Sequence, residues 1–185
     1  MIHSTHFPPA VIALTSVLCA LWAILNFTLG PLSFRLFRLP IFHDFAAFFT
    51  LLLVTWVTGK FGTASLGGII GSIIVLLVGG PLPNIGFAAS AILFDLAMSA
   101  SHHKLHVAAY DMIVATLATL VSAYFAGVII GVFLMNSPLD LETLYTALTV
   151  WGGWHLVGGI ISLAITLPLI GILEKANVRK IKGDR

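Results

Sequence analysis

The sequence predicts an all-α integral membrane protein, folded as a single bundle of about six transmembrane helices. Of its 185 residues, 59% are hydrophobic and only 9% are charged, and the mean hydropathy is +1.08. A soluble domain carries about 25% charged residues to cover its surface, so that class is excluded. Apolar runs of roughly 20 residues match the hydrocarbon core of a bilayer at about 1.5 Å of rise per helical residue. We expect a single membrane domain over residues 1–185.

The first helix is expected over about residues 8–29. Pro8 and Pro9 suit a first helical turn, and Gly30-Pro31 should end the helix. No basic segment precedes this apolar run, so we interpret it as a retained helix and not as a signal peptide. Glycine-rich and proline-rich turns bound the later segments, with Asn84 as a candidate cap. The expected helices after the first are 41–58, 64–77, 84–101, 107–135 and 141–173, followed by a basic cytoplasmic tail at 174–185.

Basic residues predict the orientation in the cell membrane. If both termini are cytoplasmic, the inner side holds Lys60, Lys104 and the five basic residues of the tail, which makes seven. The outer side then holds only Arg35 and Arg38. Inner connections carry the excess of lysine and arginine in membrane proteins, so we expect a multi-pass protein with both termini cytoplasmic.

The connection over residues 30–40 is the first candidate for function. Arg35 and Arg38 lie there in a chain that otherwise avoids charge, and charge is costly unless it reaches water, lipid headgroups, a counter-ion or a ligand. The arginines either extend to headgroups or bind an anionic group. His43 and Asp44 follow at the outer end of the next helix. Asp44 either accepts a hydrogen bond from a ligand, or caps its helix or pairs with an arginine.

Aromatic residues on the last helix form a second candidate surface. Trp151, Trp154 and His155 occupy positions i, i+3 and i+4, and this spacing predicts one helical face in the outer half of the membrane. Such a face suits a flat heterocycle. The alternative is an interfacial belt, where tryptophans settle at headgroup depth.

Asp95 is a carboxylate inside an apolar helix. One interpretation is that Asp95 binds a substrate or carries a proton. The alternative is a structural role, in which the carboxyl group is protonated or accepts a hydrogen bond from a neighbouring helix.

A histidine cluster supports a rival interpretation. His102, His103 and His106, together with His3 and His6, have the residue type and some of the spacing of a metal site. A nickel or cobalt transport subunit or a membrane metalloenzyme would fit, although the cluster lies on the predicted cytoplasmic side.

Motifs for several enzyme classes are missing. The chain contains no CxxC, Walker A, HExxH or GxSxG motif, and its one cysteine, Cys19, lies in an apolar run. We therefore expect no enzymatic activity of its own, no cofactor and no nucleic-acid partner, and any use of ATP would take place in a partner.

Several stretches resemble the substrate-binding S components of energy-coupling-factor (ECF) transporters. They are the small residues of the first helix, the segments Leu25–Phe27 and Gly30–Phe34, the turn Gly59–Ala64 and the glycine-rich third helix. The first four helices are most similar to the branch associated with thiamine precursors such as hydroxymethylpyrimidine. The resemblance implies a RibU-like six-helix bundle that binds a small heterocyclic micronutrient in its outer half.

The resemblance also implies partners and roles. An ECF transmembrane scaffold subunit and two cytoplasmic ATPases would supply the energy. The loop after the first helix, with Phe34, Arg35 and Arg38, would act as a lid. The small-residue face of the first helix would dock on the scaffold through Ala13, Ser16, Ala20 and Ala23. A structural or accessory subunit of a larger membrane complex is the alternative from another class.

Overall fold

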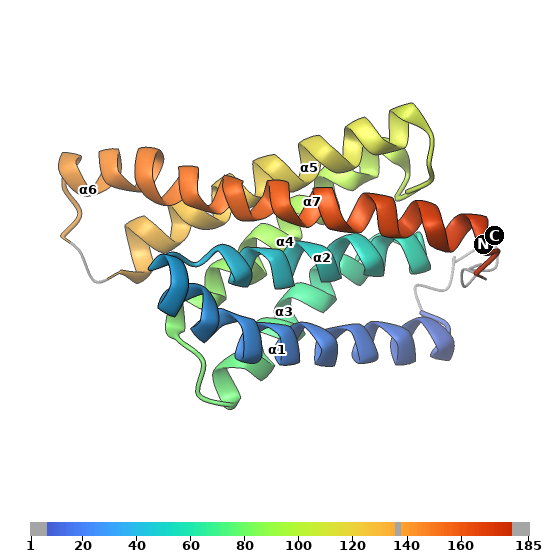
Figure 1. The fold of residues 1–185 in the computed structure, drawn as a ribbon, viewed down its shortest axis with the longest axis horizontal. Coiled ribbons are helices and arrows are strands. Elements are labelled where there is room, and N and C mark those ends of the chain that lie inside the picture. Colours follow the sequence, from blue (N-terminus) through green and yellow to red (C-terminus); the bar gives the residue numbers. More distant parts are fainter. Residues whose placement is uncertain (1–6, 136–137, 179–185) are drawn as a thin grey trace, which may run out of the picture.

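The computed structural model describes residues 7–135 and 138–178 (Figure 1). The described residues contain helices and no strands. The α-helices are α1 (Pro9–Phe37), α2 (Ile41–Thr58), α3 (Thr63–Leu77), α4 (Ile85–Met98), α5 (Ala109–Ile129), α6 (Leu141–Thr146) and α7 (Gly152–Lys175). Short 3₁₀ turns at Leu82–Asn84 and Ser99–Ser101 flank α4. A π-helical segment, Ala147–Trp151, joins α6 to α7, so that Leu141–Lys175 is one continuous span.

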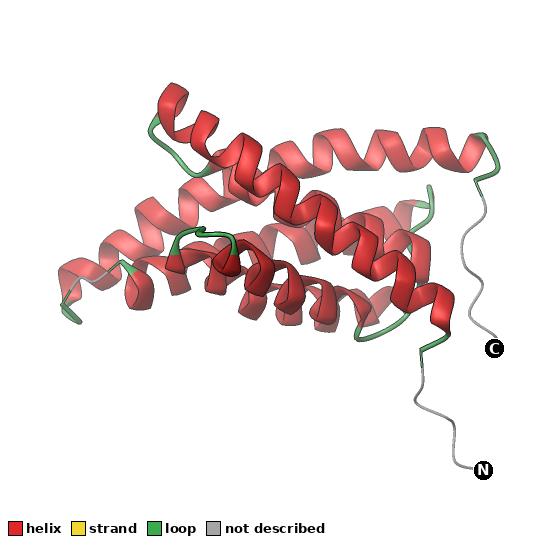
Figure 2. Cartoon of the chain, turned by 90° about the horizontal axis from the view of Figure 1, so that it is seen from below, coloured by secondary structure: helices red, strands yellow, loops and turns green. Residues whose placement is uncertain are grey.

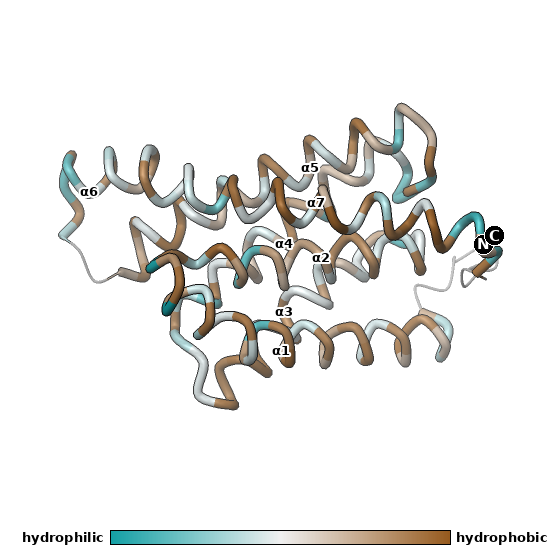
Figure 3. Tube along the Cα trace, viewed as in Figure 1, coloured by the Kyte–Doolittle hydropathy of each residue, from teal (hydrophilic) through white to brown (hydrophobic). Residues whose placement is uncertain are grey.

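The lengths and surfaces of these helices fit a multi-pass membrane protein. Five spans in the described chain are long and apolar enough to cross a bilayer, and α3 is a shorter apolar helix. Hydrophobic residues run along the helices, whereas hydrophilic residues gather near their ends (Figure 3). Large apolar side chains such as Val17, Leu117 and Ile160 are exposed on the outside of the bundle. Contiguous apolar surface of this kind requires lipid or a partner to cover it. Because the described residues form helices and no strands, the predicted all-α fold is confirmed.

Helix α2 lies at the centre of the bundle. Of its 18-residue apolar window, 78% is buried, against 33–44% for the other long helices. It packs against α1 on one side and α7 on the other, and α5 packs against both α7 and α4 (Figure 1). Seen from below, the described chain consists of helices joined by loops (Figure 2). The start of α1 and the end of α7 lie at the same end of the bundle (Figure 1). We call this the terminal end, and the region where α1 turns into α2 the turn end.

The prediction that the first helix ends at residue 29 is wrong. Helix α1 continues through Pro31 to Phe37, and Arg38 adopts the left-handed conformation that closes it. Gly30 is needed here, because an added Cβ would lie 2.4 Å from the imidazole Cε1 of His43. Ser33 Oγ donates to the Leu39 carbonyl and accepts from the Phe42 amide, which fixes the turn into α2. The expected long loop is therefore mostly helix.

One smaller expectation also differs from the structure. Asn84 does not cap α4 with its side chain but turns it toward other partners. By contrast, Asp140 caps α6 by accepting a 2.8 Å hydrogen bond from the Thr143 amide. Hydrogen bonds from Thr143 hold the pKa of the Asp140 carboxyl below its usual value.

Candidate functional site

A buried acid–imidazole pair joins α2 to α7. Asp44 lies in the first turn of α2 and His155 in the first turn of α7, and Asp44 Oδ1 is 2.7 Å from His155 Nδ1. The two side chains are 0% and 1% exposed. Gly158 permits this approach, because a Cβ there would lie 2.3 Å from Asp44 Cβ. Ser162 Oγ also donates to the main-chain carbonyl of Phe45 at 3.2 Å, so α7 is held to α2 at two levels.

One polar atom of each partner remains without a hydrogen bond. In the described chain, Asp44 Oδ2 and His155 Nε2 are buried and unpartnered. Most buried polar groups in folded proteins have a partner, and those that do not require an explanation. A carboxylate oxygen can only accept a hydrogen bond. Nε2 accepts in the neutral imidazole that carries its proton on Nδ1, and it donates in the imidazolium. The pair can therefore make further hydrogen bonds.

A chain of hydrogen bonds continues from the neighbouring histidine across α1 to the start of α4. His43 Nδ1 lies 2.9 Å from Asn26 Oδ1, and Asn26 Nδ2 donates to Asn84 Oδ1 at 3.3 Å. Asn84 Nδ2 in turn donates to the Pro81 carbonyl at 3.0 Å. We call Asn26, His43, Asp44, Asn84 and His155 the polar centre.

Aromatic rings flank both histidines of the polar centre. The Phe87 ring of α4 lies 5.7 Å from the ring of His155, and the Phe34 ring of α1 lies 5.7 Å from that of His43. Phe87 is buried and Phe34 is exposed. The centre thus combines polar atoms with aromatic walls, which is the composition of many small-molecule sites.

The two arginines lie outside the polar centre. Arg35 and Arg38 are exposed at the C-terminal end of α1, and neither forms an ion pair with an acid of the described chain. Asp44 pairs with His155 and does not cap α2. The structure therefore provides neither the helix cap nor the arginine salt bridge that the sequence left open for Asp44.

Trp154 separates from His155. Trp154 is 39% exposed, whereas His155 is buried, so the two residues do not share one face. Trp151 is partly buried in the π-helical segment and faces the same neighbouring helix as His155: an added Cβ at Gly131 would meet the Trp151 ring, and one at Gly127 would meet the His155 ring. The aromatic contacts to the polar centre come from Phe34 and Phe87 in place of these tryptophans.

Asp95 lies away from the polar centre, toward the terminal end of the bundle. It accepts hydrogen bonds from the Gly62 and Ser65 amides and from Ser65 Oγ, at the start of α3. His103 Nε2 lies 3.0 Å from both Asp95 Oδ1 and the Asp95 carbonyl oxygen. The length of α2 separates Gly62 from Asp44 by about 20 Å. These bonds give Asp95 a structural role at the start of α3.

The histidines that the sequence suggested as a metal cluster do not come together at one site. His102 is exposed, His103 contacts Asp95, and His106 Nδ1 lies 3.0 Å from Glu174 Oε1. The described residues include no group of three or more histidine, cysteine, aspartate or glutamate side chains that could hold a metal ion. His3 and His6 lie outside the described residues. The structure therefore contradicts a metal site built from His102, His103 and His106.

The small residues of α1 mostly face outward. Ala13, Ser16 and Ala20 are exposed, whereas Ala23 is buried. Ser16 Oγ donates to the Ile12 carbonyl at 2.9 Å, so its hydroxyl is satisfied within the helix. Three of the four residues thus lie on a surface that another membrane helix can approach closely.

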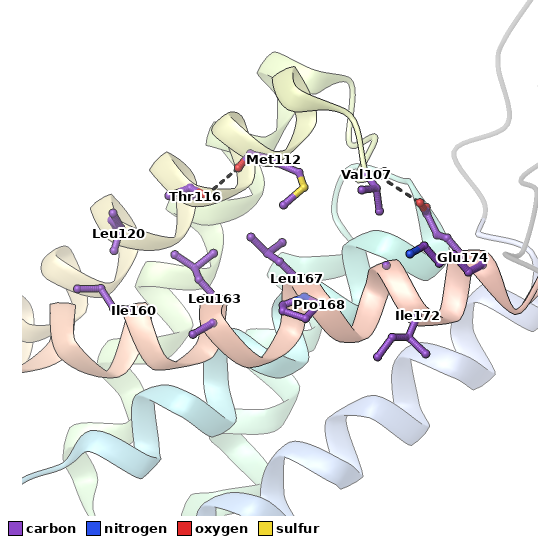
Figure 4. A pocket seen from close by; sticks show the side chains of 13 residues that line it. Val107, Met112, Thr116, Leu120, Ile160, Leu163, Leu167, Pro168, Ile172 and Glu174 are labelled. Carbon is purple, nitrogen blue, oxygen red and sulfur yellow. Dashed lines mark hydrogen bonds between the residues drawn. The ribbon is translucent and has the colours of Figure 1, made fainter.

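An apolar groove lies elsewhere on the bundle. It has a volume of about 910 Å³ and runs between α5 and α7, with apolar side chains such as Leu120, Leu163 and Leu167 along it and Glu174 at one end (Figure 4). Glu174 accepts hydrogen bonds from the Val107 amide and from Trp56 Nε1. The groove shares no residue with the polar centre, and its apolar lining suits contact with hydrocarbon.

Comparisons with known proteins give no match. No protein-family model, no curated protein and no solved structure matches this chain. Function must therefore be argued from the chemistry of the site.

Sequence reasoning missed three members of the site. Asn26, Asn84 and Phe87 were not among the predicted binding residues, although Asn26 stands out as an amide inside an apolar helix. A polar side chain in such a helix turns toward the protein interior, so this signal was available. Asn84 and Phe87 carry no comparable signal, because one follows a proline-rich turn and the other is one of 13 phenylalanines.

Proposed function

We propose that this chain is the solute-binding membrane subunit of an ECF-type importer, and that it binds a small heterocyclic micronutrient or precursor. The observation that carries the proposal is the polar centre, in which Asp44 Oδ2 and His155 Nε2 are buried and unpartnered. Ionisable side chains inside a membrane bundle are costly, and by default they mark ligand or ion pathways.

The composition around the polar centre supports a solute and not a purely structural pair. A structural pair gains most when every polar atom is bonded, because a half-satisfied buried network is less stable than an apolar core. Here two polar atoms remain available, while the aromatic rings of Phe34 and Phe87 lie beside the two imidazoles. Aromatic walls with few polar atoms suit a flat heterocycle.

The proposal assigns the energy source to partners. An ECF scaffold subunit would dock on α1 through the exposed Ala13, Ser16 and Ala20, where small side chains let helices approach closely. Two cytoplasmic ATPases would drive the cycle. With the termini cytoplasmic, as the basic residues predict, the polar centre would lie nearer the outer face.

The test is to identify small molecules that copurify with the detergent-solubilised protein, by mass spectrometry. We expect a bound heterocycle, and calorimetry with pyrimidine, thiazole and pteridine compounds should then give its affinity. His155→Gln should reduce occupancy, whereas Trp154→Phe on the exposed side should not. A solute that is retained equally by both variants would contradict the site, and the absence of any solute would contradict the function.

A second candidate is an accessory subunit of a larger membrane complex. The observation in its favour is that the polar centre bonds α1 to α2, α2 to α7 and α1 to the start of α4, as a structural network would. A complex that copurifies with this chain but carries no solute, and that lacks ATPase subunits, would favour this alternative.

A further inference from the structure

We propose that the ligand of the polar centre is a small organic cation, a nitrogen base whose charge lies on N–H groups, such as an amine or an amidine. This inference rests on the proposed function and adds the chemical class of the solute. It follows from three features of the site: the charge, the hydrogen-bonding capacity and the flanking rings.

The polar centre holds an acid without a basic partner of fixed charge. Asp44 is wholly buried, and the imidazole of His155 is its only ion-pair partner in the described chain. Arg35 and Arg38 are exposed and form no ion pair with it. A buried carboxylate needs an opposite charge or a proton, because desolvation of an unpaired ion is expensive. A cationic ligand supplies that charge, whereas an anionic ligand would bring a second negative charge into the buried site.

The available hydrogen-bonding atoms favour a donor ligand. When His155 Nδ1–H donates to Asp44 Oδ1, the neutral imidazole leaves Nε2 as an acceptor. The second free atom, Asp44 Oδ2, also accepts. A ligand that meets both atoms must bring N–H or O–H donors, and a carboxylate or phosphate brings none. A protonated His155 would instead leave one donor and one acceptor, which would favour a neutral amide-like ligand.

The neighbouring rings also suit a cation. Phe87 lies beside His155 and Phe34 beside His43, each at 5.7 Å between ring centroids. The face of an aromatic ring attracts a positive charge, and a desolvated site strengthens that attraction. With His155 neutral, charge, hydrogen bonding and packing therefore favour the same class of ligand.

The test uses three probes of matched size and different charge on the full-length protein in lipid nanodiscs. Benzamidine is a cation with N–H donors, benzamide is neutral and benzoate is an anion. Calorimetry should show that benzamidine binds about tenfold or more tightly than benzamide, since hydrogen bonds to charged groups are stronger than neutral ones, and that benzoate does not bind. Equal binding of benzamidine and benzamide, tighter binding of benzamide or benzoate, or binding of none of the three at millimolar concentration would overturn the inference.

Two variants connect the preference to the site. Asp44→Asn keeps the shape of the side chain but removes its charge, so it should abolish the preference for benzamidine. Glu142→Gln removes an exposed acid of α6 and should leave the preference unchanged. A preference that survives Asp44→Asn would refute the assignment. If Asp44→Asn does not fold, the three probes on the natural chain still decide. A copurified solute that is neutral or anionic would overturn this inference alone, whereas the absence of any solute would overturn the proposed function as well.

Discussion

Replacing Gly158 by alanine should force α2 and α7 apart at the polar centre. An added Cβ would lie 2.3 Å from Asp44 Cβ and 2.9 Å from Asp44 Oδ2, well inside ordinary contact distance. The Cβ of Asp44 is fixed to its helix and cannot rotate away, so one helix must shift. Overpacking of this kind costs about 1–3 kcal/mol. Alanine gains about 1 kcal/mol over glycine in a helix interior, so the net loss of stability should be roughly 0–2 kcal/mol.

Gly153 provides the matched control on the same helix. An added Cβ at Gly153 meets nothing within 4 Å, so Gly153→Ala keeps the helical gain without the clash. The two variants should therefore differ by about 1–3 kcal/mol in the free energy of unfolding, measured by denaturant titration in detergent micelles. Gly158→Ala should also weaken solute binding, because it displaces Asp44 from His155. Equal stability of the two variants would refute the close approach of α2 and α7.

Three further outcomes are expected. Asp95→Asn should lower the free energy of unfolding by about 1–3 kcal/mol, because it weakens the bonds at the start of α3, while calorimetry shows unchanged solute affinity. Ala20→Leu on the exposed face of α1 should reduce copurification with the proposed scaffold subunit without loss of folding, whereas Ala23→Leu in the buried part should destabilise the chain. The reverse pattern would place the proposed docking surface elsewhere. A reporter fused after Arg185 should be cytoplasmic and one inserted at Leu139 external, and opposite labelling would reverse the orientation.

The positions of the helices could be predicted because hydropathy and turn residues mark them. Helix α2 begins at Ile41 after Pro40 and ends at Thr58 before Gly59, which adopts a left-handed conformation. The end of α1 could not be predicted in this way. Gly30-Pro31 has the composition of a helix end, but Gly30 accommodates the His43 ring and Ser33 bonds across the turn into α2. Tertiary contacts therefore override a local signal that would end a helix in isolation.

The separation of Trp154 from His155 shows a second limit. Successive residues of an α-helix point about 100° apart, so the neighbours Trp154 and His155 can lie on either side of the boundary between the exposed and the buried surface, and spacing alone does not place that boundary. In a soluble protein the apolar face turns inward. In a membrane both the lipid and the protein core are apolar, so the hydropathy of the tryptophans does not indicate which of the two they face. Trp154 faces outward while His155 is buried.

Polar side chains supply the direction that hydropathy lacks. A carboxylate or amide cannot face hydrocarbon unpaired, so Asn26, Asp44 and Asp95 had to turn toward other protein groups. Their partners could not be inferred from the sequence, because Asp44 and His155 are 111 residues apart and no local pattern connects them. Only the structure distinguishes Asp95 from Asp44. Asp95 Oδ2 accepts hydrogen bonds at the start of α3 and Asp95 Oδ1 lies 3.0 Å from His103 Nε2, whereas Asp44 Oδ2 has neither kind of partner in the described chain. Two buried acids that look alike in the sequence thus divide into a structural residue and a candidate binding residue.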